Sequence, residues 1–183
     1  MITWYAADAP KETRALFLDR DGVINVHIPG GYVLDYRKDF VLRDQCVASL
    51  RPFSDAGIPI VVVSNQSCVG RGMISAQAEA DIMDAMVADL RAAGVHVSAY
   101  AFCPHAPQEN CACRKPSPVM ILETASALAI PVEQSLLIGD QSWDLEAAER
   151  AGCDALRVGA DDAEYKDIFG AAYAKLQTSP VRA

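Results

Sequence analysis

The sequence has no long hydrophobic run, no excess of basic residues and few aromatic side chains. The apolar stretch at residues 58–63 is short and contains Pro59, whereas about 20 apolar residues are needed to cross a bilayer. The chain carries 16 Lys and Arg against 24 Asp and Glu, and its net charge of -8 has the wrong sign for coating a nucleic acid duplex. We therefore expect neither membrane association nor a nucleic acid partner.

The first ten residues lack a basic cluster followed by an apolar segment, so no secretory signal is readable and we expect a cytoplasmic protein. No linker, internal repeat or low-complexity segment divides the 183 residues, of which 51% are hydrophobic and 22% charged. This composition predicts a single domain, residues 1–183, with a sizeable buried core. We expect the protein to be a monomer.

Short runs of β-branched and large aliphatic residues alternate with segments of helical periodicity. The runs predict five strands, at residues 15–18, 59–63, 95–102, 135–138 and 155–158. Helical spacing follows Asp44, Ser75 and Pro118, and a further helix is expected in the tail, residues 163–183. This alternation indicates an α/β fold, a mostly parallel sheet with helices on both faces that binds ligands at the carboxyl ends of its strands.

Two aspartates, Asp19 and Asp21, follow the first predicted strand in the sequence DRDGVIN. A carboxylate held beside Mg²⁺ can attack phosphorus, and a neighbour two positions on can donate a proton to the leaving oxygen. Gly22 permits the sharp turn that this arrangement needs. On its own, an Asp-x-Asp pair is more often a helix cap or a solvated turn, so its meaning depends on the other strand ends.

Polar groups also follow the second and fourth predicted strands. The second strand ends in VVVSNQS, where Ser64 and the following backbone amides can cradle a phosphate. The fourth ends at Asp140, with Asp144 one helical turn later. Arg114 and Lys115 precede a predicted helix, and an ammonium there would neutralise transferring phosphoryl oxygens. Each signal is weak alone, since Ser and Asn often end strands and an Arg-Lys pair is usually solvated.

Taken in order, DRDGVIN, VVVSNQS, CRKP and IGDQSWD resemble the four motifs of the haloacid dehalogenase (HAD) superfamily of phosphatases, and they span residues 19–144. Together with Gly31-Tyr32-Val33, Arg71-Gly72 and the CPH segment, these motifs are similar to those of the D-glycero-D-manno-heptose 1,7-bisphosphate phosphatase family. Histidinol-phosphate phosphatases are related to this family and share the motifs. The resemblance implies a HAD-like Rossmannoid fold with a minimal cap. It also implies removal of the 7-phosphate in nucleotide-activated heptose biosynthesis.

The same resemblance implies roles for individual residues in a two-step hydrolysis. Asp19 would be the nucleophile that forms an aspartyl-phosphate, and Asp21 would protonate the leaving oxygen and then activate water. Ser64 and Lys115 would hold the phosphoryl oxygens. Mg²⁺ would be bound by Asp19, Asp140 and the backbone carbonyl of Asp21.

The implied contacts to a small phosphorylated sugar form a larger set. Its members are Gly31, Tyr32, Asn65, Gln66, Ser67, Arg71 and Arg114. Asp144 is expected outside the metal's own ligands. The chain departs from the family pattern at two points: Ser64 stands where Thr is commoner, which keeps the hydroxyl, and residues 27–30 lengthen the loop before Gly31.

Three of the six cysteines, Cys103, Cys111 and Cys113, lie within eleven positions that also contain His105. In a reducing compartment, three thiolates and an imidazole in one loop favour a closed tetrahedral Zn²⁺ site over disulfides. Their spacing differs from the usual CxxC pairs, which leaves a free-thiol or redox role open. The resemblance implies structural zinc in the loop 103–113, and Cys113 directly precedes Arg114, so a bound zinc would fix the two cations that follow.

Three alternatives are compatible with parts of this pattern. A histidinol-phosphate phosphatase would use the same catalytic residues. A phospho-acceptor signalling domain also combines a strand-end Asp, a Ser or Thr and a Lys around Mg²⁺, but it keeps its phosphate, whereas Asp21 favours turnover. A zinc-stabilised binding module without activity is the third, and the intact motif set argues against it.

Overall fold

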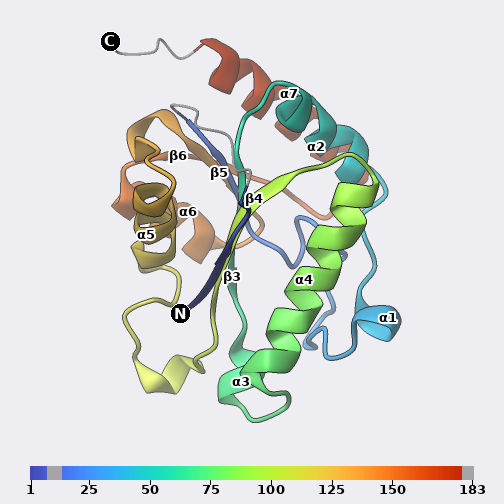
Figure 1. Ribbon diagram of the computed structural model, residues 1–183, viewed down its shortest axis with the longest axis vertical. Coiled ribbons are helices and arrows are strands. Elements are labelled where there is room, and N and C mark those ends of the chain that lie inside the picture. The colour runs from blue at the N-terminus through green and yellow to red at the C-terminus, as the bar shows by residue number, and fades with distance from the viewer. Residues whose placement is uncertain (8–13, 179–183) are drawn as a thin grey trace.

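The computed structural model describes residues 1–7 and 14–178 of the chain. In this part of the chain six strands form one sheet in the order β1-β4-β3-β2-β5-β6 (Figure 1). The strands are β1 (Ile2–Tyr5), β2 (Leu16–Leu18), β3 (Ile60–Asn65), β4 (Val97–Cys103), β5 (Leu136–Gly139) and β6 (Asp154–Arg157). β1 runs antiparallel to β4, and the other neighbouring pairs are parallel, which confirms the predicted fold class.

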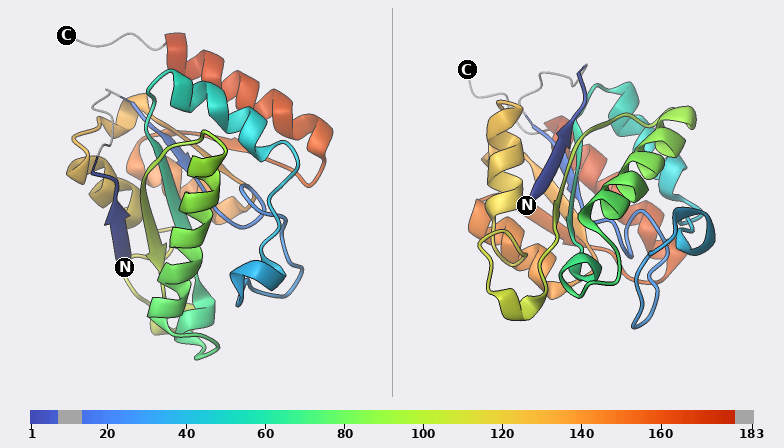
Figure 2. Two further views of the ribbon diagram at one scale, coloured as in Figure 1. Left: turned by 45° about the vertical axis from the view of Figure 1, so that its right-hand side comes forward. Right: turned by 60° about the horizontal axis from the view of Figure 1, so that its bottom comes forward.

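Helices cover both faces of the sheet (Figures 1 and 2). They are α1 (Tyr36–Asp39), α2 (Cys46–Asp55), α3 (Ser67–Gly70), α4 (Ala76–Ala92), α5 (Val119–Ala127), α6 (Ser142–Ala151) and α7 (Asp162–Thr178), with 3-10 turns η1 (Pro107–Glu109) and η2 (Val132–Gln134). α2, α4 and α7 lie on one face, and α5 and α6 lie on the other. None of the helices in the described ranges is long and apolar enough to span a membrane.

The side chains of the central strands explain why both faces are covered. In β2, Leu16 and Leu18 point into the cluster under α2, α4 and α7, whereas Phe17 points into the cluster under α5 and α6. All three are fully buried. Because successive side chains of a strand face opposite ways, an apolar strand without polar alternation requires a layer on each side.

The five predicted strands are confirmed with ends shifted by one or two residues, and the sixth, β1, was not predicted. β1 is a four-residue edge strand whose side chains alternate between half-buried and exposed, so it lacks the apolar run that marks the others. The tail helix is confirmed as α7 as far as Thr178, and residues 179–183 lie outside the described residues. The segment between β2 and α2 holds only α1, which is the predicted minimal cap.

Candidate active site

The parallel register brings three functional strand ends together. Leu18 of β2 lies opposite Val62 of β3 on one side and Ile138 of β5 on the other. Asp19, directly after β2, also donates its backbone N–H to the Ile138 carbonyl at 3.0 Å. Asp19, Ser64 and Asp140 therefore meet at one edge of the sheet, where parallel α/β sheets bind ligands.

The carboxylate of Asp19 is buried and fixed through one of its oxygens. Oδ1 accepts hydrogen bonds from the backbone N–H of Arg20 at 2.7 Å and from Ser64 Oγ at 3.0 Å, and it lies 2.9 Å from Lys115 Nζ. Across residues 1–7 and 14–178, no hydrogen bond reaches Oδ2, so this oxygen is available for a reacting atom. Burial raises the pKa of Asp19 to about 7, although the Lys115 ammonium acts in the opposite direction.

Lys115 is fully buried, and its ammonium lies within 3 Å of three oxygen atoms. Nζ donates to the Val63 carbonyl at 2.7 Å and lies 2.6 Å from Asp144 Oδ1, in addition to the contact with Asp19. Asn65 holds the backbone of Lys115 from both sides, accepting its N–H at 3.0 Å and donating to its carbonyl at 3.1 Å. The ammonium is thus fixed before any ligand binds.

Asp21 lies at the edge of the cavity and accepts hydrogen bonds from three side chains. Arg20 donates at 2.9 Å, Gln66 at 2.8 Å and Asn25 at 3.0 Å. Gln66 also donates to Ser64 Oγ at 2.9 Å, which connects the two predicted catalytic groups. Burial alone would raise the pKa of Asp21, but Arg20 and the two amides outweigh it and hold that pKa below its usual value.

Three carboxylates at this edge fit a divalent cation. Asp19, Asp140 and Asp144 each offer an oxygen within 4.8 Å of the others. Asp140 Oδ1 is buried without a hydrogen-bond partner, while Oδ2 accepts from Gln141 at 2.7 Å. A buried oxygen without a donor is costly unless a cation binds it, and Mg²⁺ prefers carboxylate oxygens. The donor set therefore fits Mg²⁺.

Gly22 allows the chain to turn between the two motifs. Its φ is +85°, and a Cβ atom there would lie 2.3 Å from Asp140 Oδ2. The left-handed conformation and the close approach of Asp140 both exclude a side chain at this position. The turn thus brings the Asp19 and Asp21 segment against Asp140.

A cavity of about 360 Å³ opens over these groups. Of the predicted residues, it is lined by Asp19, Asp21, Gly31, Tyr32, Ser64, Asn65, Ser67, Arg114 and Asp140. Two predicted substrate contacts are absent from its wall: Gln66 is fully buried behind the carboxylates, and Arg71 is exposed outside the cavity. Arg114 is held in place by Ser67 Oγ, to which Nη1 donates at 2.7 Å.

Sequence reasoning missed several residues of this site. His27 and Trp143 line the cavity, and the side chain of Trp143 is 41% exposed. An aromatic residue three positions after a strand-end Asp was the available signal for Trp143. Arg20 is a fully buried partner of Asp21, which the motif alone does not reveal. Asp144, expected from the sequence to lie outside the metal's own ligands, is a fully buried partner of Lys115.

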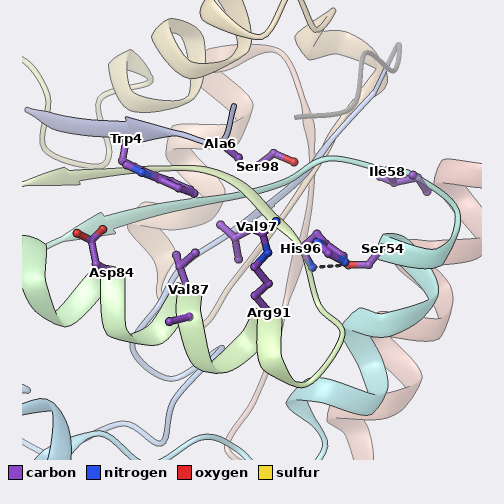
Figure 3. Close-up of a pocket in the computed structure, with 12 residues that line it drawn as sticks. Trp4, Ala6, Ser54, Ile58, Asp84, Val87, Arg91, His96, Val97 and Ser98 are labelled. Carbon is purple, nitrogen blue, oxygen red and sulfur yellow. Dashed lines mark hydrogen bonds between the residues drawn. The ribbon is translucent and has the colours of Figure 1, made fainter. Parts of the chain in front are cut away.

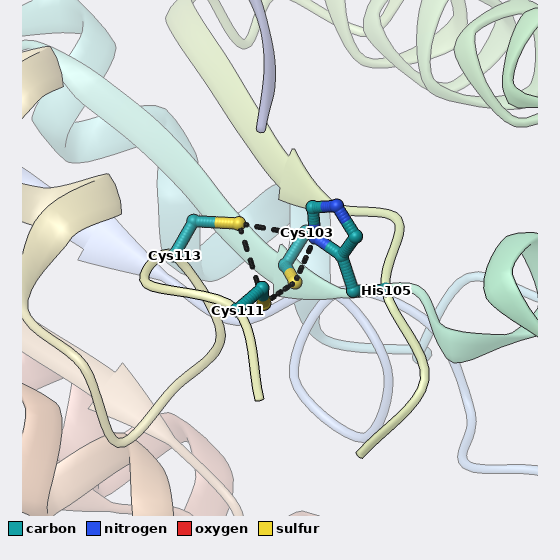
Figure 4. Close-up of side chains that lie close together, drawn as sticks. All are labelled: Cys103, His105, Cys111 and Cys113. Atoms are coloured by element: carbon teal, nitrogen blue, oxygen red, sulfur yellow. Dashed lines mark hydrogen bonds between the residues drawn. The ribbon is translucent and has the colours of Figure 1, made fainter. Parts of the chain in front are cut away.

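The cysteine cluster lies beside this site, in the loop between β4 and α5 (Figure 4). Cys111 Sγ lies 3.5 Å from Cys103 Sγ and 3.8 Å from Cys113 Sγ. His105 Nδ1 lies 3.6 Å from Cys103 Sγ and 3.5 Å from Cys113 Sγ. A tetrahedral Zn²⁺ with bonds of about 2.3 Å to sulfur and about 2.0 Å to nitrogen separates such donors by about 3.8 Å and about 3.5 Å. The four side chains thus form a set that can hold a metal ion of this kind.

A separate cavity of about 360 Å³ lies between β1, β4 and α4 (Figure 3). Trp4, Asp84, Arg91 and His96 are on its wall, and the His96 N–H donates to Ser54 Oγ at 2.9 Å. None of the residues that line it belongs to the predicted site. The catalytic chemistry is therefore assigned to the sheet edge.

Comparisons with known proteins agree with this geometry. Residues 112–179 match the HAD-hydrolase-like family. The D-glycero-alpha-D-manno-heptose-1,7-bisphosphate 7-phosphatase of Photorhabdus laumondii is 35% identical over 146 residues, 76% of this chain and 78% of that protein. The corresponding beta-anomer 7-phosphatase of Helicobacter pylori is 37% identical over 139 residues, 75% and 79% of the two chains.

A solved structure with a similar fold is also a heptose bisphosphate phosphatase. The D,D-heptose 1,7-bisphosphate phosphatase of B. bronchiseptica, complexed with magnesium and phosphate, is 29% identical with a TM-score of 0.74 and covers 86% of each chain. The fold and the carboxylates at its sheet edge define a HAD-like hydrolase. Within that class, the chain belongs to the heptose-1,7-bisphosphate 7-phosphatase family and is a phosphoric monoester hydrolase.

Proposed function

We propose that this protein removes the 7-phosphate of D-glycero-D-manno-heptose 1,7-bisphosphate through an aspartyl-phosphate on Asp19. The observation that carries the proposal is the meeting of Asp19, Ser64 and Asp140 at one cavity, with the Lys115 ammonium buried 2.9 Å from Asp19 Oδ1. The names of the curated relatives support the choice of sugar.

In the first step, Asp19 Oδ2 attacks phosphorus while the bond from phosphorus to the sugar oxygen breaks. Asp21 gives its proton to that oxygen, so the sugar leaves as an alcohol. Ser64 Oγ and Lys115 Nζ, which both contact Asp19 Oδ1 in this structure, would exchange that contact for the phosphoryl oxygens when the substrate binds. A dianionic phosphoryl group beside Asp21 raises the pKa of this residue and helps it to hold the proton.

In the second step, the Asp21 carboxylate takes a proton from water as the water oxygen attacks phosphorus. The bond between phosphorus and Asp19 breaks, which restores the carboxylate and releases inorganic phosphate. Asp19 and Asp140 would hold Mg²⁺, which when bound offsets the negative charge of the phosphoryl group. The buried Asp140 Oδ1 without a donor supports this assignment.

The sugar itself is assigned to the wall formed by Tyr32, Arg114 and Trp143. Trp143 follows Asp140 by three residues at the start of α6 and lines the same cavity as Asp19. An exposed indole at the edge of a cavity offers an apolar face for the C–H groups of a sugar ring. The Arg114 guanidinium offers donors for hydroxyl or phosphate oxygens.

We further propose that Cys103, His105, Cys111 and Cys113 bind a structural Zn²⁺. The distances between the donor atoms support four-coordinate binding, which leaves no position for a reacting water. The His105 carbonyl accepts a hydrogen bond from Arg114 Nη1 at 3.4 Å. Zinc would thereby fix the loop that carries Arg114 into the cavity.

Side-by-side assays of phosphate release test the proposed function. The purified protein should hydrolyse heptose 1,7-bisphosphate in the presence of Mg²⁺ with a much higher kcat/KM than histidinol phosphate. Both anomers of the heptose belong in the assay, because the relatives named above include an alpha-anomer and a beta-anomer enzyme. A preference for histidinol phosphate would overturn the proposal, and release of a single phosphate per protein would indicate a phospho-acceptor domain.

A further inference from the structure

Arg20 lies between the two catalytic aspartates in the sequence, yet its side chain does not line the cavity. It is fully buried, and its guanidinium binds two carboxylates at once. Nε and Nη2 donate to Asp21 at 2.9 to 3.2 Å, and Nη1 forms an ion pair with Glu79 Oε1. The guanidinium therefore connects the predicted proton donor to a carboxylate 59 residues away.

Glu79 belongs to the first turn of α4 and is also fully buried. The start of this helix is fixed by Ser75, whose Oγ accepts the N–H of Ala78 at 3.0 Å. The remaining neighbours of the pair are weakly polar: Cys68 Sγ lies 3.7 Å from Glu79 Oε2, and Met83 Sδ lies 3.7 Å from Arg20 Nη1. The pair is thus enclosed by protein and is held by the helix.

A buried ion pair contributes little net stability, because the loss of hydration offsets most of the attraction between the charges. A well-packed apolar pair in the same place would stabilise the fold as well or better. The charges instead fix an orientation. A planar guanidinium that donates two hydrogen bonds to one carboxylate fixes the plane of that carboxylate. Asp21 is the group whose orientation is fixed in this way.

We propose that Arg20 and Glu79 are positioning residues that hold the Asp21 carboxyl in the orientation required for proton transfer to the leaving oxygen. Glu79 holds the guanidinium of Arg20 in place, and Arg20 in turn orients the Asp21 carboxylate. Neither Glu79 nor Arg20 contacts the substrate in this proposal. Gln66 and Asn25 complete the set of donors around Asp21. The inference rests on the proposed phosphatase mechanism and adds two residues to it.

This role predicts a dependence on the leaving group. An alkyl phosphate, such as a sugar phosphate, needs a proton from Asp21 as its P–O bond breaks, whereas p-nitrophenyl phosphate releases a stable phenolate without one. Glu79→Gln should therefore lower kcat/KM for the alkyl ester by about tenfold or more, within the range that general acid catalysis supplies. The same variant should leave kcat/KM for the aryl ester within about twofold, because that parameter reports only the steps up to phosphate transfer.

A series of phosphate monoesters with leaving groups between these two extremes completes the measurement. The wild-type protein should show a shallow decrease of kcat/KM as the leaving group becomes more basic, and Glu79→Gln a steep one. Asp81→Asn is the matched control, since it removes one negative charge from the exposed side of the same helix, where Asp81 accepts from Gln77 at 2.9 Å. This control should reproduce the wild-type series.

Removal of one member of a buried pair can prevent folding, so a second variant is needed. Arg20→Met combined with Glu79→Met removes both charges and keeps the volume filled, and it should fold while showing the same steep dependence on the leaving group. If either folded variant lowers kcat/KM equally for all the esters, or changes kcat/KM for none of them, the pair does not position Asp21 and the inference is wrong. Failure of wild-type protein to act on the heptose bisphosphate, with esters still hydrolysed, would instead reject only the proposed substrate.

Discussion

Asp19 and Asp21 are two positions apart, but their surroundings differ. Asp19 is buried against Lys115, and burial raises its pKa to about 7. Asp21 lies beside Arg20, which with neighbouring amides outweighs burial and lowers its pKa. Of these two aspartates, only Asp19 has an oxygen that accepts no hydrogen bond from the described part of the chain. These two pKa shifts alone run opposite to the roles of nucleophile and proton donor, and a bound Mg²⁺ beside Asp19 and a phosphoryl dianion beside Asp21 would reverse them. The open Oδ2 is the feature that marks Asp19 as the nucleophile.

Asp19→Asn should reduce phosphate release by at least about a thousandfold, because the amide keeps the volume of the side chain but is not a nucleophile. The thermal unfolding transition should stay cooperative, which shows that the loss is not caused by misfolding. Retained turnover in this variant would rule out covalent catalysis by Asp19.

Trp143→Ala should raise KM for the sugar phosphate by roughly threefold to tenfold with little change in kcat, since aromatic stacking contributes about 0.5–1.5 kcal/mol. Steady-state kinetics would measure this change. Trp4→Phe is the matched control: Trp4 stacks on Tyr100 with ring centroids 5.6 Å apart and lines the separate cavity in Figure 3. Equal effects of the two substitutions would contradict the assignment of Trp143.

The sequence predicted which catalytic residues share the site, but not all of their contacts. Asp19, Ser64 and Asp140 could be predicted because parallel strands bring their carboxyl ends together. Gln66 was predicted to touch substrate, whereas the structure places it on Asp21 and Ser64. No feature of the sequence indicated a role for Glu79. It is a polar residue on the buried face of α4, and its partner, Arg20, is known only once α4 is packed against the sheet.

At the scale of elements, the loop between β4 and α5 connects the cysteine cluster to the cavity. Cys103 ends β4, and Cys113 is followed at once by Arg114 and Lys115. The Gly70 N–H at the end of α3 donates to the Pro104 carbonyl at 2.7 Å, so the loop is also held to the element after β3. A metal in this loop would stabilise the position of both cations.

Cys111→Ser should lower the zinc content below one ion per chain and destabilise the protein by more than about 2 kcal/mol, because metal binding contributes directly to folding. Metal analysis and thermal unfolding would measure both effects. Cys153→Ser is the matched control, as Cys153 is buried outside the cluster and its variant should keep the metal. A metal analysis that finds no zinc in freshly purified wild-type protein would contradict the proposal.

The elements were predicted where their apolar pattern is strong and missed where it is weak. The central strands carry continuous apolar runs because they are covered on both faces, so the sequence marks them clearly. β1 pairs only with β4 at the edge, and its alternating pattern is too short to stand out. The four residues of α3 follow Gln66 and are likewise set by tertiary contacts rather than by periodicity.

At the scale of the whole molecule, a chain of net charge -8 is proposed to bind a doubly phosphorylated substrate. Net charge sets the distant field, whereas Lys115, Arg114 and a bound cation set the field in the cavity. The six-stranded sheet provides the rigid frame on which these groups are placed. A single domain, a monomeric state and a cytoplasmic location stay predictions from the sequence.

Removal of Mg²⁺ should abolish turnover, and added Mg²⁺ should restore it, because three carboxylates crowd around a single ammonium without the cation. Phosphate release after chelation and after readdition of Mg²⁺ measures this. The zinc content must be followed in parallel, so that loss of the structural metal is not mistaken for loss of the catalytic one. Full activity after complete removal of divalent cations would contradict the assigned metal site.

The central claim is tested most directly by phosphorus NMR of heptose 1,7-bisphosphate incubated with the protein and Mg²⁺. We predict that the resonance of the 7-phosphate disappears at catalytic protein concentration, inorganic phosphate appears in equal amount, and the 1-phosphate resonance is retained. Loss of the 1-phosphate, or no change in either resonance, would contradict the account.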